Sequence, residues 1–174
     1  MNEYHQTQQY QQQLTVGKIA EKFFAGMLED RFGMKCVFPE VEGAFSPYDF
    51  TAIGKKESKT IEVKFDTTAI KHSKKRSDGA VNLFIEFFNP VGMYASKLPA
   101  SQADLIAYIL NEVSTCYLID QAKLKQFIID KYKNNQKVYI GTNNTETVGL
   151  GFLLNVEELK QKRLITEDWT IKWD

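Results

Sequence analysis

Residues 48–64 read YDFTAIGKKESKTIEVK, and this stretch decides the fold. Apolar and β-branched runs stand at both of its ends, and Gly54–Ser58 between them is rich in turn-forming residues, so the pattern predicts a β-hairpin. Side chains alternate between the two faces of a strand, here Thr60–Phe65. The apolar side chains of one face are then Ile61, Val63 and Phe65.

The opposite face of the same strand carries Glu62 and Lys64. Burying charged side chains on a central strand costs free energy unless they form ion pairs or take part in a functional site. Asp49 directly precedes the first strand, Phe50–Ile53, so the hairpin brings it near Glu62. Two such carboxylates can hold a hard divalent cation such as Mg²⁺, and the lysine can orient a water or neutralise phosphate charge. The alternative is an ordinary ion pair between Glu62 and Lys64 on a solvated edge.

Outward from the hairpin, the pattern predicts an α/β fold with a mixed sheet flanked by helices. Apolar residues recur at helical spacing over Thr15–Phe32, and Gly33 is expected to stop that helix. A second helix is predicted to begin at Ser101, as its cap, and to run through Tyr108 and Leu110. The further predicted strands are Lys35–Phe38, Asn82–Phe88, Cys116–Ile119, Lys137–Ile140, Leu150–Leu154 and Trp169–Trp173. The further predicted helices are Ala122–Tyr132 and Val156–Lys162.

The chain of 174 residues has the length of one domain. Residues 1–14 are predicted to form a flexible arm or an extension of the first helix, because this stretch is rich in glutamine. Residues 15–174 are predicted to form a single domain. No linker or internal repeat divides them.

Charge and composition exclude several classes of protein. The 22 basic and 22 acidic residues give a net charge of zero, so no global basic field exists, and 43% hydrophobic residues exclude a disordered chain. Cys36 and Cys116 form no disulfide or metal pattern, which favours a reducing, cytoplasmic setting. No apolar run is long enough to span a membrane.

The segment Ser46–Asp49 (SPYD) followed by Glu62–Lys64 (EVK) resembles the PD-(D/E)XK nuclease superfamily, which has the restriction-endonuclease-like fold. The family core is a helix, a strand meander and a βα return. Pro47 stands one residue further from the aspartate than the family proline does. The resemblance implies that Asp49 and Glu62 bind the metal and that Lys64 assists the attacking water. Many members add a glutamate from the first helix, which corresponds to Glu21 as a further catalytic and metal-binding residue; the alternative is a solvated helix glutamate.

Basic residues gather beside this motif. Between Lys55 and Arg76 there are eight basic and three acidic residues. The run that ends this segment is predicted to be a flexible basic loop that holds a phosphate backbone, through Lys71, Lys74, Lys75 and Arg76. The alternative is a solvated loop. Glu86, which interrupts an apolar run, is either a further acid of the site or the structural partner of a lysine.

The function expected from these features is that of a Mg²⁺-dependent DNA endonuclease, with Mn²⁺ as a substitute. By analogy with phage-type and Holliday-junction-resolvase-like enzymes, which commonly act as homodimers, the expected activity is structure-selective. The enzymatic alternatives are an exonuclease and a restriction-type enzyme. The alternative from another class is a catalytically inactive member of the fold that binds nucleic acid or a protein partner.

Overall fold

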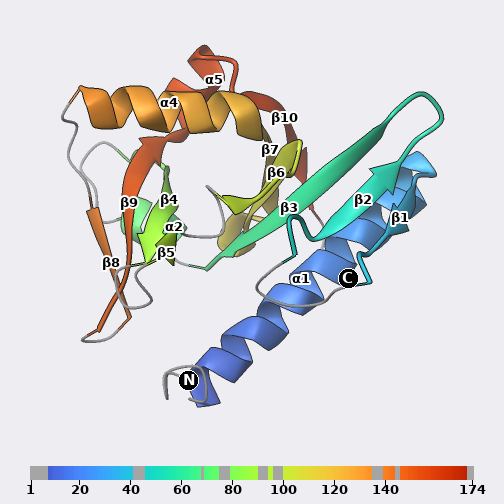
Figure 1. The fold of residues 1–174 in the computed structure, drawn as a ribbon, viewed down its shortest axis with the longest axis horizontal. Helices are drawn as coiled ribbons and strands as arrows, with labels where there is room; N and C mark the ends of the chain where they lie inside the picture. Colours follow the sequence, from blue (N-terminus) through green and yellow to red (C-terminus); the bar gives the residue numbers. More distant parts are fainter. Residues whose placement is uncertain are drawn as a thin grey trace.

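The computed structural model describes residues 8–40, 46–67, 69–74, 79–89, 94–95, 100–134, 139–143 and 146–171. Within these ranges the chain is a mixed α/β protein with two β-sheets (Figure 1). The helices are α1 (Gln8–Phe32), α2 (Ala69–Ser73), α4 (Gln121–Lys133) and α5 (Val156–Gln161), with a 3₁₀ turn, η2 (Asn111–Val113). The strands are β1 (Lys35–Val37), β2 (Phe50–Ile53), β3 (Ser58–Asp66), β4 (Asn82–Asn89), β5 (Tyr94–Ala95), β6 (Leu105–Leu110), β7 (Thr115–Asp120), β8 (Tyr139–Asn143), β9 (Glu146–Asn155) and β10 (Ile165–Thr170).

The larger sheet, which we call sheet A, has six strands among the described residues, in the order β1-β2-β3-β6-β7-β10. β1, β2 and β3 form an antiparallel meander, and β3 pairs with β6 in parallel, with Lys64 opposite Tyr108. β7 returns antiparallel to β6. Because β3 has neighbours on both sides, its side chains are directed at the two faces of the sheet rather than at an edge.

The smaller sheet, sheet B, has four strands in the described part of the chain, in the order β5-β4-β9-β8. β4 and β9 are antiparallel, with Ile85 opposite Phe152 and Glu86 opposite Gly151. In Figure 1, α1 runs along the β1–β3 part of sheet A, whereas sheet B, α4 and α5 lie toward the other side of the molecule. The two faces of sheet A are therefore covered by different elements.

The face of sheet A under α1 has its own apolar core. Phe24 and Leu28 of α1 pack with Phe50 of β2 and Ile61 of β3. The partly buried side chains packed against this core include Val63 and Phe65, which confirms the predicted apolar face of the hairpin. α1 ends where expected, because Gly33 takes the left-handed conformation, at φ 60°, that favours glycine.

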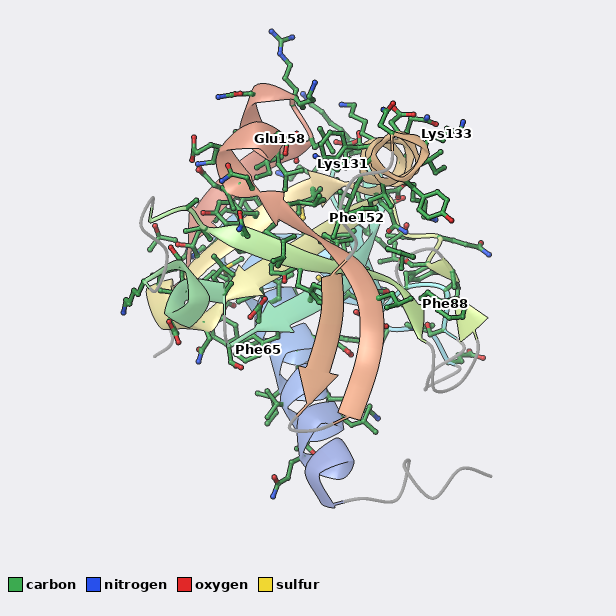
Figure 2. All side chains as sticks on the ribbon, turned by 90° about the vertical axis from the view of Figure 1, so that its left-hand side faces the viewer. Phe65, Phe88, Lys131, Lys133, Phe152 and Glu158 are labelled. Atoms are coloured by element: carbon green, nitrogen blue, oxygen red, sulfur yellow. The ribbon has the colours of Figure 1, made fainter. Side chains whose placement is uncertain are left out.

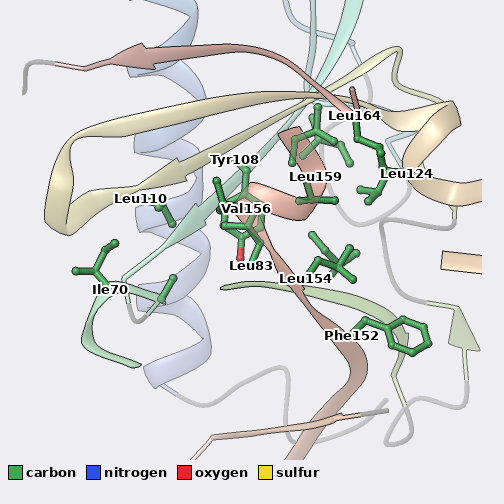
Figure 3. Packing of buried hydrophobic residues seen from close by; sticks show 14 residues of the cluster. Ile70, Leu83, Tyr108, Leu110, Leu124, Phe152, Leu154, Val156, Leu159 and Leu164 are labelled. Carbon is green, nitrogen blue, oxygen red and sulfur yellow. The ribbon is translucent and has the colours of Figure 1, made fainter. Parts of the chain in front are cut away.

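The second core lies between sheet A, sheet B, α4 and α5 (Figure 3). Its fully buried members include Leu83 of β4, Tyr108 of β6 and Leu159 of α5. Beside this core, Nζ of Lys131 on α4 lies 3.0 Å from Oε1 of Glu158 on α5, two residues that are labelled in Figure 2. Glu62 and Lys64 belong to the face of β3 that is opposite Ile61, so they are on this side of sheet A.

The predicted helix through Tyr108 and Leu110 is wrong, because residues 105–110 form the central strand β6. All of its residues from Ile106 to Leu110 are buried. A strand covered on both faces has apolar side chains on both, so periodicity alone does not separate it from a buried helix. The two residues of the apparent capping pattern make other contacts. The Ser101 hydroxyl lies 3.0 Å from the Pro47 carbonyl oxygen, and the Asp104 carboxylate accepts from the Thr60 N–H at 2.8 Å.

The other predicted elements within the described residues are confirmed, with shifted ends. α4 and α5 match the predicted helices, and β1, β4, β7 and β9 match predicted strands. β8 and β10 overlap the predicted strands, whose residues 137–138 and 172–173 lie outside the described ranges. Residues 8–14 of the predicted arm are the first turns of α1, and residues 1–7 lie outside the described ranges. No helix in the described part of the chain has both the length and the apolar character needed to cross a membrane.

A buried tyrosine joins the two sheets. Tyr108 is completely buried, and its hydroxyl donates to Oδ2 of Asp66 at 2.6 Å and lies 3.4 Å from the Phe84 carbonyl oxygen. Burial raises the pKa of Tyr108 well above the usual value, and the charge of Asp66 and the hydrogen bond to it raise this pKa further. In the folded protein the phenol therefore keeps its proton where an exposed tyrosine would lose it.

Tyr108→Phe is expected to lower the free energy of unfolding by about 1.5–3 kcal/mol at neutral pH, the usual range for a hydrogen bond to a charged group. Above pH ~10 the unfolded tyrosine loses its proton while the folded one keeps it, so the wild-type protein loses stability as pH rises. The variant lacks this part of the loss. Urea unfolding from pH 7 to pH 11 measures both effects, and equal alkaline slopes for the two proteins would contradict the assignment.

Candidate functional site

Asp49 is hydrogen-bonded to the backbone of β3 at the two residues that flank Glu62. Its backbone N–H donates to the Ile61 carbonyl at 2.9 Å, and its Oδ2 accepts from the Val63 N–H at 2.7 Å. The register of the hairpin, with Phe50 opposite Ile61, continues to place Asp49 opposite Glu62. Directly opposite residues of an antiparallel pair have Cβ atoms roughly 4.5–5.5 Å apart, on the same face. The hairpin therefore brings Asp49 and Glu62 together, as the sequence predicts.

Both carboxylates are shielded from solvent. Asp49 is 7% exposed and Glu62 is 6% exposed. Burial of an ionised carboxylate is costly unless hydrogen bonds or positive charge offset it, and Asp49 receives one such hydrogen bond from the strand backbone. Lys64 stands two residues beyond Glu62 on the same face of β3, and its side chain is exposed. The hairpin thus combines two buried carboxylates with one accessible ammonium.

A further set of hydrogen bonds fixes the segment that precedes Asp49. The Pro47 carbonyl oxygen accepts from the Gln102 N–H at 2.8 Å and lies 3.0 Å from the Ser101 hydroxyl. The carbonyl of Ser101 in turn accepts from Nε2 of Gln121 at 2.9 Å and from Nζ of Lys125 at 2.6 Å. Gln121 is 1% exposed, yet nothing in its local sequence context indicates this role. The loop before β6 therefore holds the start of β2 in place.

Asp66 connects the site strand to the basic segment. Its Oδ1 accepts from the Ala69 N–H at 2.9 Å, so the carboxylate caps the start of α2 while its other oxygen binds Tyr108. Lys71 lies in α2, and the exposed Lys74 directly follows this helix. The segment predicted as a basic loop is thus helical as far as Ser73, because Asp66 supplies the missing acceptor for its first turn. Lys75 and Arg76 lie outside the described residues.

Glu86, the other acid that the sequence singles out, lies outside sheet A. It lies on β4 of sheet B, half-buried. Burial raises the pKa of Glu86, and the positive charge of Lys64 partly offsets this increase. Both sequence alternatives for Glu86, a further acid of the site and a structural partner of a lysine, therefore stay predictions.

Glu21 occupies a different position from the hairpin acids. It lies on α1, which packs against the face of sheet A that carries Ile61, whereas Glu62 belongs to the opposite face. Among the described residues, no group of three or more histidine, cysteine, aspartate or glutamate side chains is arranged to hold a metal ion. The structure therefore does not bring Glu21 into one cluster with Asp49 and Glu62.

The donor chemistry of Asp49 and Glu62 fits a hard divalent cation. Mg²⁺ usually keeps several waters and binds through one or two protein carboxylates together with substrate phosphates, so two acids are sufficient. An ionised carboxylate has about four lone-pair sites, so the hydrogen bond at Oδ2 of Asp49 is compatible with metal binding by the same group. No protein-family model, no curated protein and no solved structure matches the chain. The donor chemistry of Asp49 and Glu62 is therefore what points to a function.

Proposed function

We propose that this protein is a Mg²⁺-dependent DNA endonuclease that hydrolyses phosphodiester bonds and selects its substrates by structure. The observation that carries the proposal is the attachment of Asp49 to the backbone on both sides of Glu62. This attachment supports a shared site for two buried carboxylates, with Lys64 beside them. A cation held by two such carboxylates would activate a water and polarise a phosphate, which is the chemistry of metal-assisted phosphodiester hydrolysis.

The order of the elements supports the resemblance to the PD-(D/E)XK superfamily. α1 is followed by the meander β1-β2-β3, then by α2, and later by β6, which pairs with β3 in parallel. This is the helix, strand meander and βα return that the resemblance implies. Sheet B is an addition to that core, because β4 and β5 are inserted between α2 and β6. We propose a restriction-endonuclease-like core on this basis.

In the proposed mechanism Asp49 and Glu62 hold the cation, and Mn²⁺ can replace Mg²⁺ there. When bound, the cation lowers the pKa of a water and offsets negative charge on the phosphate. The hydrogen bond from Val63 holds the Asp49 carboxylate against β3, so this ligand is oriented before substrate arrives. The Lys64 ammonium orients the attacking water and stabilises the charge that develops on the phosphate oxygens. Lys71, Lys74, Lys75 and Arg76 bind the DNA backbone.

A cleavage assay on defined substrates tests the proposal. The full chain is incubated with a four-way junction, a linear duplex and a single strand, each end-labelled, in Mg²⁺, in Mn²⁺ and in chelator. Internal cuts in the junction that require the metal are expected, with slower cutting of the linear substrates. Digestion from the ends would instead indicate an exonuclease. Binding of DNA with no cleavage under any condition would favour the catalytically inactive alternative.

The basic segment is expected to contribute to affinity rather than to chemistry. Replacing Lys74, Lys75 and Arg76 with alanine should weaken DNA binding and reduce the slope of log K against log salt by about 0.9 for each phosphate that is no longer neutralised. The matched control replaces the exposed Lys123, Lys133 and Lys162, which changes the net charge equally at α4 and after α5. Fluorescence anisotropy from 50 to 300 mM salt measures both slopes. Equal slopes in the parent and the first variant would mean that the segment is solvated and does not contact the DNA backbone.

A further inference from the structure

The face of sheet A that carries Asp49 and Glu62 is covered over only part of its area. On this face Ile106, Tyr108 and Leu110 of β6 belong to the core that sheet B, α4 and α5 complete. The hairpin of β2 and β3 extends past this core, and in Figure 1 its turn projects away from sheet B, α4 and α5. The two buried acids therefore lie toward the end of the covered part.

Beyond the acids the same face is accessible to solvent. Thr51 lies opposite Thr60, two residues from the acids along each strand. Ile53 lies opposite both Ser58 and Lys35, four residues from the acids. Because side chains alternate along a strand, all five residues share the face of the two acids. Ile53 is 41% exposed, and Lys35 and Ser58 are exposed as well, so in the part of the chain that the structure describes this end of the face is open.

The open end of the face is basic. Lys55 and Lys56 are exposed at the turn between β2 and β3, and Lys35 lies beside this turn on β1. Among the described residues none of these three lysines forms an ion pair, whereas Lys59 lies 3.3 Å from the carboxylate of Glu57. Three ammonium groups are thus available to an external anion at one end of the hairpin.

The other polar groups of this surface are also donors that suit a phosphate backbone. Thr51 and Ser58 add hydroxyl groups to the three ammonium groups, and both kinds of donor contact phosphate oxygens in protein–DNA complexes. The Asp104 carboxylate lies nearby, and it accepts from the Thr60 N–H at 2.8 Å and from the Thr60 hydroxyl at 3.0 Å. These two donors partly offset its negative charge, so the surface as a whole favours a polyanion.

The dimensions fit one arm of a duplex. Four residues separate the acids from the open end of the hairpin, which is roughly 13 Å at the usual rise of a strand. In the other direction β3 runs four residues from Glu62 to Asp66, which caps α2, and α2 packs on this same side of the sheet through Ala69 and Ile70. Basic segments therefore lie on both sides of the acids, about 26 Å apart, which is the length of roughly eight base pairs.

We propose that this hairpin surface is a second binding surface for the DNA backbone, which holds the substrate on the side of the acids away from α2. The hairpin surface consists of Lys35, Thr51, Ile53, Lys55, Lys56 and Ser58. Its ammonium and hydroxyl groups bind phosphates, and the exposed Ile53 contacts the sugars between them. Backbone contacts on both sides of the acids then fix the position of the phosphate that is cut. This inference rests on the proposed function, because it takes the substrate to be DNA.

The salt dependence of DNA binding tests the hairpin surface. Lys35, Lys55 and Lys56 are replaced together with alanine, and binding of a fluorescent four-way junction is followed by anisotropy in chelator, without cleavage. The slope of log K against log salt should become shallower by roughly 2 to 3, and the dissociation constant at 100 mM salt should rise at least ~10-fold. The control variant with three exposed lysines replaced on α4 and after α5 should keep the parent slope. An unchanged slope in the hairpin variant would overturn the proposal.

Two isoleucines test whether DNA lies on the face itself. Ile53→Glu adds a carboxylate to the open face, and Ile129→Glu adds one to α4, at side chains that are 41% and 45% exposed. The first variant should bind the junction roughly 10-fold more weakly at 100 mM salt, whereas the second should bind as the parent does. Urea unfolding shows whether both variants are folded. Equal affinities of the two folded variants would contradict a DNA contact at this face.

The outcomes separate the hairpin surface from the proposed function. Metal-dependent cleavage by the parent, with no contribution of the hairpin to binding, would overturn the surface and retain the nuclease. Binding that depends on the hairpin, with no cleavage in Mg²⁺ or Mn²⁺, would retain the surface and reject the nuclease. A parent protein that binds no DNA even at 50 mM salt would overturn both.

Discussion

The Asp49→Asn variant is expected to lose cleavage by roughly 10²- to 10⁴-fold, because a metal-binding charge worth several kcal/mol to the transition state is removed. The fold should be kept. The asparagine carbonyl oxygen can still accept the Val63 N–H that now lies 2.7 Å from Oδ2, so the start of β2 remains attached to β3. DNA binding should be retained or become tighter, since one negative charge near the phosphate is absent.

Asp49→Ala separates the two roles of this residue. It removes the acceptor as well as the charge and leaves the Val63 N–H unsatisfied, which should cost about 1–3 kcal/mol of stability in addition to the activity. Single-turnover rates, urea unfolding and calorimetric titration with Mg²⁺ distinguish the variants. An Asp49→Asn protein that is folded and cuts every substrate as fast as the parent would show that the site is assigned wrongly.

The Lys64→Ala variant should lose cleavage by about 10²- to 10³-fold, the usual effect of removing one group that stabilises developing charge. Metal binding should remain, because an ammonium is not a ligand. Stability should change little, since Lys64 is exposed and the packing of β3 depends on Ile61, Val63 and Phe65 on its other face.

Lys59→Ala is the matched control for Lys64. Lys59 is on the same strand but alternates to the opposite face, where its ammonium lies 3.3 Å from the Glu57 carboxylate. An ion pair of this exposure contributes little to stability, and its loss should leave the cleavage rate near that of the parent. Equal losses in the two variants, measured with saturating DNA, would indicate a general effect of positive charge rather than a role specific to Lys64.

The hairpin was predictable because all of its determinants are local. The turn at Gly54–Ser58 sets the register, and the period of two assigns Ile61 and Glu62 to opposite faces. The same reasoning failed at Leu105–Leu110, because a strand with both faces buried has no amphipathic period to detect. The environment of Ser101 was misjudged for a related reason: a capping pattern describes only neighbours in sequence, whereas Ser101 binds Pro47 and Gln121.

The sequence by itself determined that Asp49 and Glu62 meet, since a short turn and strand alternation leave one arrangement for residues so near along the chain. Only the tertiary structure decided that Glu21 is on the helix that packs against the other face of sheet A, and that Asp66 joins α2 to Tyr108. These relations depend on the parallel pairing of β3 with β6 and on the packing of a second sheet, in which partners far apart in sequence meet. Closure of such long loops is driven by the burial of two separate cores, and no local pattern of residues records which polar side chains that burial brings together.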